Sequence, residues 1–239
     1  MNIAVIFAGG SGQRMNTRSK PKQFLDVHGK PVIVYTLEIF QEHKDIDGII
    51  LVCIESWIEY TKELTKKYNL TKVLDVIPGG KIGQESIFLG LKTVYEKYDK
   101  NSIVLIHDGV RPLINNNVIS DCLDCVDKNG NAVTIAPAIE TIFRKNEDNT
   151  VGEIFKRSDC LLAKAPQCFY LKDIYNAHLK AQSENKYDFI DSASMMQYYG
   201  YKLYTVEGPI ENIKITTPSD FYIFRAIMDA RENLQILGF

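Results

Sequence analysis

Hydrophobic and polar positions follow two alternating rhythms along the chain. Short apolar runs rich in β-branched residues are separated by longer stretches in which apolar residues recur at helical spacing. The apolar runs are residues 3–7, 48–54, 72–77, 102–109 and 131–138, and the amphipathic stretches that separate them are 31–43, 57–69, 83–98 and 115–130. This alternation predicts βαβ units and an α/β fold with a doubly wound, mostly parallel, Rossmann-like sheet.

One part of the chain departs from this rhythm. Residues 140–167 contain two extended segments joined by a polar turn at 146–149, with no crossover helix, which predicts a β-hairpin arm at about 139–165 that projects from the main body. Beyond it we expect helices at 171–182, at 192–200 and from Pro218 onward, and a strand at 202–208. Because no linker, repeat or low-complexity tract interrupts the pattern, we predict a single domain over residues 1–239.

Composition narrows the class of protein. The chain has 239 residues, 45% of them apolar and 24% charged, which is ordinary for a globular domain with a core. The formal net charge of −2 argues against a nucleic-acid partner. No signal peptide and no run of 18 apolar residues is present, and the five cysteines are scattered rather than arranged as a disulfide framework. We therefore expect a cytoplasmic protein that does not bind membranes.

The first apolar run ends in a glycine-rich turn, residues 9–12, followed by cations. The dinucleotide fingerprint G-x-G-x-x-G fails because Met15 stands where the last glycine belongs, and no P-loop motif follows the strand. Small residues let backbone N–H groups approach a polyphosphate, and Arg14 and Lys22 can add charge-assisted hydrogen bonds. These features favour a loop that binds nucleotide phosphates, but is neither a dinucleotide fingerprint nor a P-loop, over a turn without function.

Candidate chemistry elsewhere is sparse. Asp108 follows a buried run, so its carboxylate should emerge at the carboxyl edge of the sheet, where it suits either Mg²⁺ beside a polyphosphate or a simple Asp-Gly turn. Lys214, considered alone, is typical of a charged residue on the protein surface. Cys122 and Cys125 form a C-x-x-C motif whose i,i+3 spacing within a helix favours a structural role over zinc binding. With no acid–base constellation in the sequence, we expect a reaction driven by positioning and electrostatics.

Ordered motifs along the whole chain resemble one enzyme family. The segments FAGGSGQRM, KPKQF, PGGKIGQESI, IHDGVRP, ETI, KR…APQ, DSAS and ENIKITTPSD are similar to those of the cytidylyltransferases that make CDP-linked polyols. This group includes the methylerythritol phosphate and ribitol phosphate enzymes. The resemblance implies a nucleotide-diphospho-sugar transferase fold, a homodimer, and attack by a polyol phosphate on the α-phosphorus of CTP.

The resemblance also assigns roles to residues. Arg14, Lys22 and Lys214 would neutralise charge in the transition state, and Asp108 would hold the Mg²⁺ cofactor. The implied nucleotide-binding positions are Phe7, Ala8, Gly9, Gly10, Gly12, Gly80, Ser86, Asp108 and Gly109.

The acceptor side of the resemblance is less regular. Thr141 and Arg157, on the dimerisation arm, would reach the polyol phosphate in the partner's site, and Asp191 would bind the acceptor in its own. The chain departs from the methylerythritol enzymes at Gly83, where they carry arginine, and at Ala165 and Ile190, where they carry threonine. We therefore favour D-ribitol 5-phosphate or a similar alditol phosphate, with methylerythritol phosphate as the alternative. A regulatory nucleotide-binding module and a dehydrogenase are the rivals from other classes.

Overall fold

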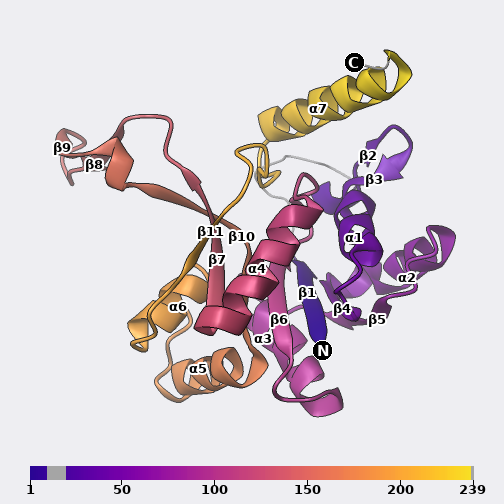
Figure 1. Ribbon diagram of the computed structural model, residues 1–239, viewed down its shortest axis with the longest axis horizontal. Helices are drawn as coiled ribbons and strands as arrows, with labels where there is room; N and C mark the ends of the chain where they lie inside the picture. The colour runs from indigo at the N-terminus through magenta and orange to yellow at the C-terminus, as the bar shows by residue number, and fades with distance from the viewer. Residues whose placement is uncertain (10–19, 238–239) are drawn as a thin grey trace.

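The computed structural model describes residues 1–9 and 20–237, and its centre is a seven-stranded sheet (Figure 1). The strands run in the order β11-β7-β10-β6-β1-β4-β5. Their bounds are β1 (Asn2–Ala8), β4 (Gly48–Cys53), β5 (Val73–Pro78), β6 (Ile103–Asp108), β7 (Asn131–Pro137), β10 (Leu161–Tyr170) and β11 (Thr205–Glu207). Strand β1 lies between β4 and β6 and pairs with both in parallel. The predicted α/β class and mostly parallel sheet are confirmed.

Strand β10 was not predicted. Sequence reasoning assigned residues up to 167 to the irregular stretch, but β10 crosses the sheet antiparallel to both β6 and β7. Its first residues are exposed, whereas Cys168 and Phe169 are completely buried. A strand whose two halves lie in such different surroundings shows no period-2 pattern over its whole length, which is why the pattern concealed it.

Helices cover both faces of the sheet. The helices on one face are α1 (Val32–Glu42), α2 (Ile58–Lys67) and α4 (Asn116–Asn129), and those on the other are α3 (Gly83–Lys97), α5 (Leu171–Ser183) and α6 (Ser192–Tyr198). Alternate residues of β1 serve the two cores, since Ile6 packs in the first and Val5 in the second. A buried strand with apolar residues on both faces explains the continuous apolar run at the N-terminus.

One glycine brings α3 close to the sheet. A Cβ atom on Gly90 would collide with the Val5 side chain and lie 3.0 Å from Cγ2 of Val52. Because valine side chains in strands have little freedom to move, only glycine allows this approach. The close packing holds the middle of α3 against the middle of β1, and Ser86, one turn earlier in the helix, lies beside Gly9.

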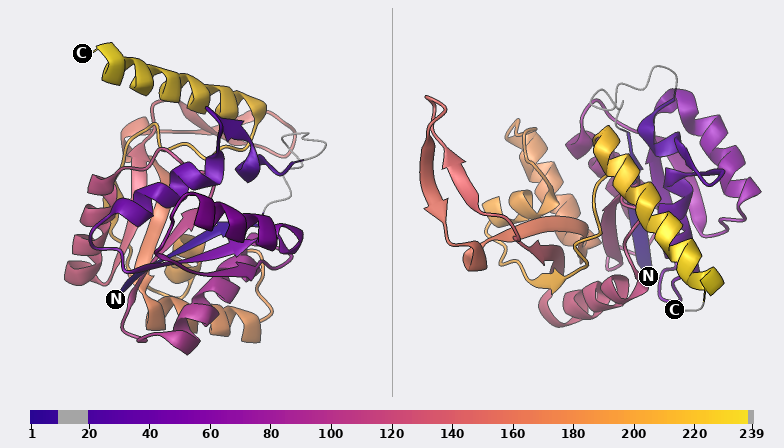
Figure 2. Two further views of the ribbon diagram at one scale, coloured as in Figure 1. Left: turned by 90° about the vertical axis from the view of Figure 1, so that its right-hand side faces the viewer. Right: turned by 90° about the horizontal axis from the view of Figure 1, so that it is seen from above.

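The predicted arm is present. Strands β8 (Ile142–Lys145) and β9 (Val151–Phe155) form a separate antiparallel hairpin, with Asn149 in the turn at φ 65°. The hairpin projects from the main body (Figure 2). Its exposed apolar side chains include Phe143, Val151 and Ile154. The hairpin itself is confirmed, and its role in dimerisation remains a prediction.

The last helix, α7 (Pro218–Leu237), packs through its first half on a third apolar cluster that contains Ile215 and Phe224. It lies near the small hairpin of β2 (Asp26–Val27) and β3 (Lys30–Pro31), as Figure 1 shows. Among residues 1–9 and 20–237, no helix combines the length and the apolar character that crossing a membrane requires.

The cysteines play no part in a metal or disulfide site within the described structure. All five are free thiols, and the described residues contain no group of three or more histidines, cysteines or acids that could hold a metal ion. Cys122 is buried on α4 with its Sγ 3.4 Å from Oγ1 of Thr134. Both cysteines of the C-x-x-C motif lie within α4, as their i,i+3 spacing predicted.

Candidate active site

Two adjoining cavities open at the carboxyl ends of β1 and β6, where ligands of such sheets bind. Their volumes are about 380 Å³ and about 410 Å³. We call the smaller one the glycine cavity, which is lined by Ala8, Gly9, Lys22, Gly80 and Ser86 among others. We call the larger one the polar cavity, which is lined by Gln84, Arg111, Lys164, Gln167, His178, Asp191 and Ser192 among others. The residues common to both walls are Phe7, Ile82, Gly83, Asp108 and Lys214.

Asp108, the last residue of β6, is the carboxylate at the junction of the cavities. Its Oδ1 lies 2.6 Å from Nζ of Lys214, and its Oδ2 accepts a hydrogen bond of 2.8 Å from Nε of Arg111. Burial acts to raise the pKa of this carboxyl group, but the charges and hydrogen bonds of the two cations outweigh it and hold the pKa below its ordinary value of 3.8. Asp108 is therefore ionised at neutral pH.

Lys22 comes from the short 3-10 helix η2 (Lys22–Phe24), immediately after the glycine-rich turn. The residue is buried, and its Nζ donates a hydrogen bond of 2.8 Å to the carbonyl of Ile215, next to Lys214. The following residue, Gln23, donates from Nε2 to the carbonyl of Ala8 at 2.7 Å. These two bonds fix the segment to both the end of β1 and the irregular segment that carries Lys214. Two of the predicted catalytic residues, Lys22 and Lys214, therefore lie close enough to line one cavity.

Ser86, at the start of α3, lies between Gly9, which follows β1, and Gly80, which follows β5. Its Oγ accepts a hydrogen bond of 3.0 Å from the N–H of Gly80 and donates one of 3.0 Å to the carbonyl of Ile82. A Cβ atom at Gly9 would lie only 3.3 Å from this hydroxyl, so the absence of a side chain keeps the wall open. Gly109 differs from the other predicted nucleotide-binding residues, since it is buried behind the wall and its N–H donates to the carbonyl of Phe7.

His107 is completely buried beside the site. Its Nε2 lies 3.2 Å from the carbonyl of Arg111, and its ring packs against Phe40. Burial, opposed only in part by the charge of Asp108, lowers its pKa to about 4, so the ring is neutral at pH 7.

The predicted acceptor residues separate into two groups. Asp191 lines the polar cavity, and its carboxylate caps α6 through Ser194 N–H at 2.8 Å and accepts from Nε2 of Gln167 at 2.8 Å. Thr141 and Arg157 lie on the exposed arm and line neither cavity of their own chain. Arg157 instead donates to the carbonyl of Ile139 at 3.1 Å. Their proposed place in a partner's site remains a prediction.

Three predicted residues of the glycine-rich turn, Gly10, Gly12 and Arg14, lie outside the described residues. Two cations of the site were missed. Arg111 belongs to the motif IHDGVRP and follows Asp108 by three residues. A spacing of three across a tight turn could have predicted that its guanidinium pairs with this carboxylate. Lys164 on β10 had no such signal; burial and then the charge of Arg111 lower its pKa.

Comparisons with known proteins match the chain to cytidylyltransferases. Residues 2–230 match the family described as IspD, 2-C-methyl-D-erythritol 4-phosphate cytidylyltransferase. A ribitol-5-phosphate cytidylyltransferase of Vibrio parahaemolyticus is 52% identical over 238 residues, with 100% of both chains covered. A 2-C-methyl-D-erythritol 4-phosphate cytidylyltransferase of Clostridium botulinum is 37% identical, covering 95% of this chain and 97% of the relative. The crystal structure of 4-diphosphocytidyl-2C-methyl-D-erythritol synthase from Anaerococcus prevotii matches with a TM-score of 0.81 at 28% identity, covering 95% of this chain and 96% of that one.

The ion pairs of Asp108 predict a pH-dependent loss of stability in Arg111→Met. Removing one cation from the buried carboxylate should lower the free energy of unfolding by about 1–3 kcal/mol at pH 7. Because the folded-state pKa of Asp108 lies below 3.8, the contribution is present above that value and disappears as the pH falls through the folded pKa. Urea unfolding of the wild type and of Arg111→Met, at pH values from 7 down through the folded pKa of Asp108, measures this change in the free energy of unfolding.

Lys97→Met is the matched control for that experiment. Lys97 also contacts an aspartate, Asp75, at 2.7 Å, but this ion pair lies on the surface. Its removal should cost less stability than Arg111→Met. Equal losses in the two variants at pH 7, or a loss in Arg111→Met that is as large below the folded pKa of Asp108 as at pH 7, would contradict the assignment. A smaller residual loss at low pH is expected, because Arg111 also donates to the carbonyl of Asn212.

Proposed function

The chain belongs to the IspD family of cytidylyltransferases, and from this premise we propose that it transfers CMP from CTP to D-ribitol 5-phosphate, giving CDP-ribitol and pyrophosphate. The observation that carries the choice of acceptor is the full-length identity of 52% to a ribitol-5-phosphate cytidylyltransferase, against 37% to a methylerythritol phosphate enzyme. The changes at Gly83, Ala165 and Ile190 support the same choice, since each departs from the methylerythritol pattern. Methylerythritol phosphate is the less supported alternative.

The glycine cavity suits the nucleotide. The backbone at Ala8 and Gly9 has no long side chain to keep a triphosphate away, and Lys22 and Lys214 lie in the same wall. With Arg14 from the adjoining turn, these cations would neutralise the charge that develops on the α-phosphorus and the leaving pyrophosphate. Gly10 and Gly12 would extend the same backbone contacts, and Ser86 would position the base and ribose.

The phosphate of the acceptor is proposed to lie at the junction of the cavities. Arg111 and Lys164 line the polar cavity there and supply positive charge near Asp108 and Lys214. An oxygen of the acceptor phosphate forms the new bond to the α-phosphorus while the bond to pyrophosphate breaks in line. The nucleophile is already ionised at neutral pH, so no side chain has to remove a proton.

The residues of the junction fit a Mg²⁺ ion bound mainly by substrate. Asp108 is the only carboxylate among the described residues that line the glycine cavity, and Mg²⁺ is commonly held by one or two carboxylates with phosphate oxygens and water. When bound, the ion would withdraw negative charge from the triphosphate. Asp108 itself also orients Lys214 and Arg111, a role that its ion pairs support.

We further propose a cytoplasmic homodimer in which the arm completes the partner's site. The arm exposes apolar side chains, since Phe143 is 50% and Ile154 is 64% accessible to solvent. An isolated two-stranded hairpin is marginally stable in water, so a second subunit would stabilise it. In this arrangement Thr141 and Arg157 would contact the acceptor of the other chain.

The proposed function is tested by the choice of substrates. Pyrophosphate release is measured with each of the four nucleoside triphosphates against ribitol 5-phosphate, erythritol 4-phosphate, methylerythritol 4-phosphate and glycerol 3-phosphate. We expect the highest kcat/KM with CTP and ribitol 5-phosphate. A higher value with methylerythritol 4-phosphate would make the alternative correct, and no release with any pair would reject the transferase.

Two neighbouring lysines test the phosphate site. Lys22→Ala should lower kcat/KM by about 10²–10³-fold, because loss of a preorganised contact to the transition state costs about 2.7–4 kcal/mol. Arg14→Ala should have an effect of similar size. Lys20→Ala is the matched control, since Lys20 pairs with Asp26 at 2.8 Å and lines neither cavity. Near-normal activity of both Lys22→Ala and Arg14→Ala would remove these residues from the mechanism.

Complementation tests the shared site. Arg157→Ala should raise the KM for the acceptor, and Asp108→Asn should inactivate the chain that carries it. A heterodimer of the two variants, isolated with two affinity tags, contains one site with intact Asp108 and intact partner Arg157. We expect about half of the wild-type activity per dimer; activity no higher than that of either variant homodimer would show that each site is built from one chain.

A further inference from the structure

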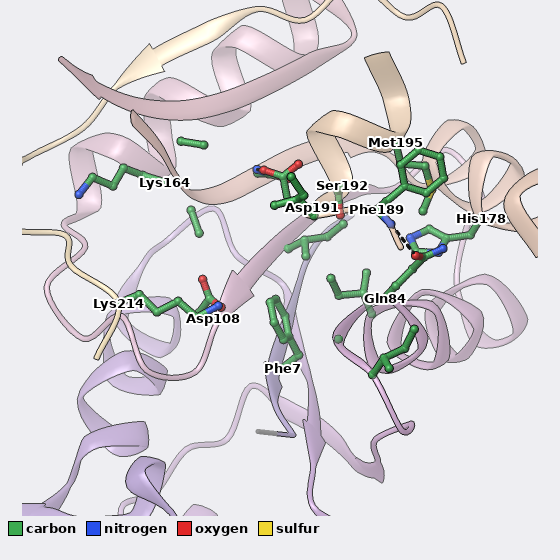
Figure 3. Close-up of a pocket in the computed structure, with 18 of the residues that line it drawn as sticks. Phe7, Gln84, Asp108, Lys164, His178, Phe189, Asp191, Ser192, Met195 and Lys214 are labelled. Carbon is green, nitrogen blue, oxygen red and sulfur yellow. Dashed lines mark hydrogen bonds and ion pairs between the residues drawn. The ribbon is translucent and has the colours of Figure 1, made fainter. Parts of the chain in front are cut away.

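The polar cavity has two chemically different ends (Figure 3). Asp108, Lys164 and Lys214 lie on one side of the view, and His178 and Ser192 lie on the other. The first end carries the charges that the proposed function assigns to phosphate. The second end lies deeper, between α3, α5 and α6. The proposed reaction assigns no role to His178 or Ser192 at this end.

Two buried polar atoms at the deep end make no hydrogen bond with the described residues. They are Nε2 of His178 and Oγ of Ser192. The residues are 1% and 3% exposed, respectively, yet both line the cavity. The two atoms are almost completely covered by protein, so they lie just behind the cavity wall that their residues form. Buried polar groups are nearly always hydrogen bonded, so two unpaired ones behind the same wall point to an occupant that supplies the partners once a small shift of the side chains admits it.

The protonation state of His178 suits an uncharged occupant. Burial alone lowers its pKa to about 4, so the imidazole is neutral at pH 7. A neutral ring offers one nitrogen as donor and the other as acceptor, and a serine hydroxyl can do either. Alcohol groups match this pair, whereas a second phosphate would find no cation there.

The polar side chains around these two atoms already have partners. Gln84 donates to the carbonyl of Lys186 at 2.9 Å and accepts from the N–H of Phe189 at 3.3 Å. Gln167 donates to Asp191 at 2.8 Å and accepts from the N–H of Ala193 at 2.9 Å. Both amides are held at each end, so neither is available to turn toward His178 or Ser192 without breaking bonds to the backbone or the α6 cap.

The apolar part of the wall fits a carbon chain. Phe7, Ile87, Ile106 and Met195 line the cavity together with the polar residues. The volume of about 410 Å³ lies within the range of small-molecule sites. A chain with a charged head and hydroxyl groups along its length would find both kinds of contact in this one cavity.

We propose that the polyol chain of the acceptor extends from the cationic end into the polar cavity, where Nε2 of His178 and Oγ of Ser192 hydrogen-bond its distal hydroxyl groups and so select chain length. This inference rests on the proposed function, because it takes the acceptor to be a polyol phosphate. His178 and Ser192 are then specificity residues that contact the end of the substrate farthest from the reacting oxygen.

The test compares a long and a short acceptor on the same variants. The KM of ribitol 5-phosphate, the KM of CTP and the Ki of glycerol 3-phosphate as a competitor are measured for the wild type, His178→Leu and Ser192→Ala. We expect the KM of ribitol 5-phosphate to rise about tenfold in each variant, as one lost hydrogen bond in a buried site implies. The Ki of glycerol 3-phosphate and the KM of CTP should change by less than about twofold, because that competitor lacks the distal carbons.

Two further variants serve as controls. His178→Gln keeps a donor and an acceptor and should recover most of the affinity lost in His178→Leu. Leu179→Ala changes an exposed neighbour on α5 that does not line the cavity, and all three constants should match the wild type. Thermal unfolding of each variant identifies any that fail to fold, in which case Ser192→Ala and His178→Gln carry the comparison.

The outcomes are distinct. An unchanged KM for ribitol 5-phosphate in both His178→Leu and Ser192→Ala would overturn the inference. A parallel rise in the KM of ribitol 5-phosphate and the Ki of glycerol 3-phosphate would also overturn it, because it would indicate a change in the phosphate end. If the wild-type protein transfers CMP to no polyol phosphate, the proposed function fails as well, whereas activity without the selective effect rejects only the deep-end contacts.

Discussion

The buried carboxylate of Asp108 is the interaction on which the site depends. Its two oxygens hold Lys214, from the segment before α7, and Arg111, from the turn after β6. Arg111 also donates to the carbonyl of Asn212 at 2.9 Å, so the same pair fixes the course of the backbone before Lys214. A carboxylate in this place is stable only with such partners, because burial by itself would favour its neutral form.

This arrangement gives the described part of the site more cations than carboxylates. Lys22, Lys214, Arg111 and Lys164 surround the one carboxylate at the junction of the two cavities. Phosphoryl transfer has little need for covalent or proton-transfer chemistry by the protein, and positioning with charge neutralisation supplies most of the rate. The neutral state of buried His107 and the free, scattered cysteines are consistent with that chemistry.

The reversed strand β10 connects the sheet to the proposed acceptor pocket. Because it runs antiparallel between β6 and β7, it carries Lys164 past the carboxyl end of β6 and places Gln167 opposite Ile106, and both residues line the polar cavity. Gln167 then pairs with Asp191 and orients the start of α6, which presents Ser192. The outer half of the same strand pairs with the end of β7 and begins shortly after the arm, so one element links the proposed acceptor pocket with the proposed dimer contact.

The sequence alone determined the α/β class, the sheet of parallel strands, the arm and the places of Lys22 and Asp108. These features follow from local rules: the period of apolar residues identifies each element, and parallel strands direct their carboxyl ends to one edge.

The tertiary structure decided which distant segments meet at that edge of the sheet. It reversed β10, brought Arg111 and Lys214 to opposite oxygens of Asp108, and set His178 of α5 and Ser192 of α6 in one cavity wall. Contacts of this kind depend on how helices pack across the sheet, and hydrophobic periodicity specifies which face of a helix is buried but not which polar atom that face brings to a cavity.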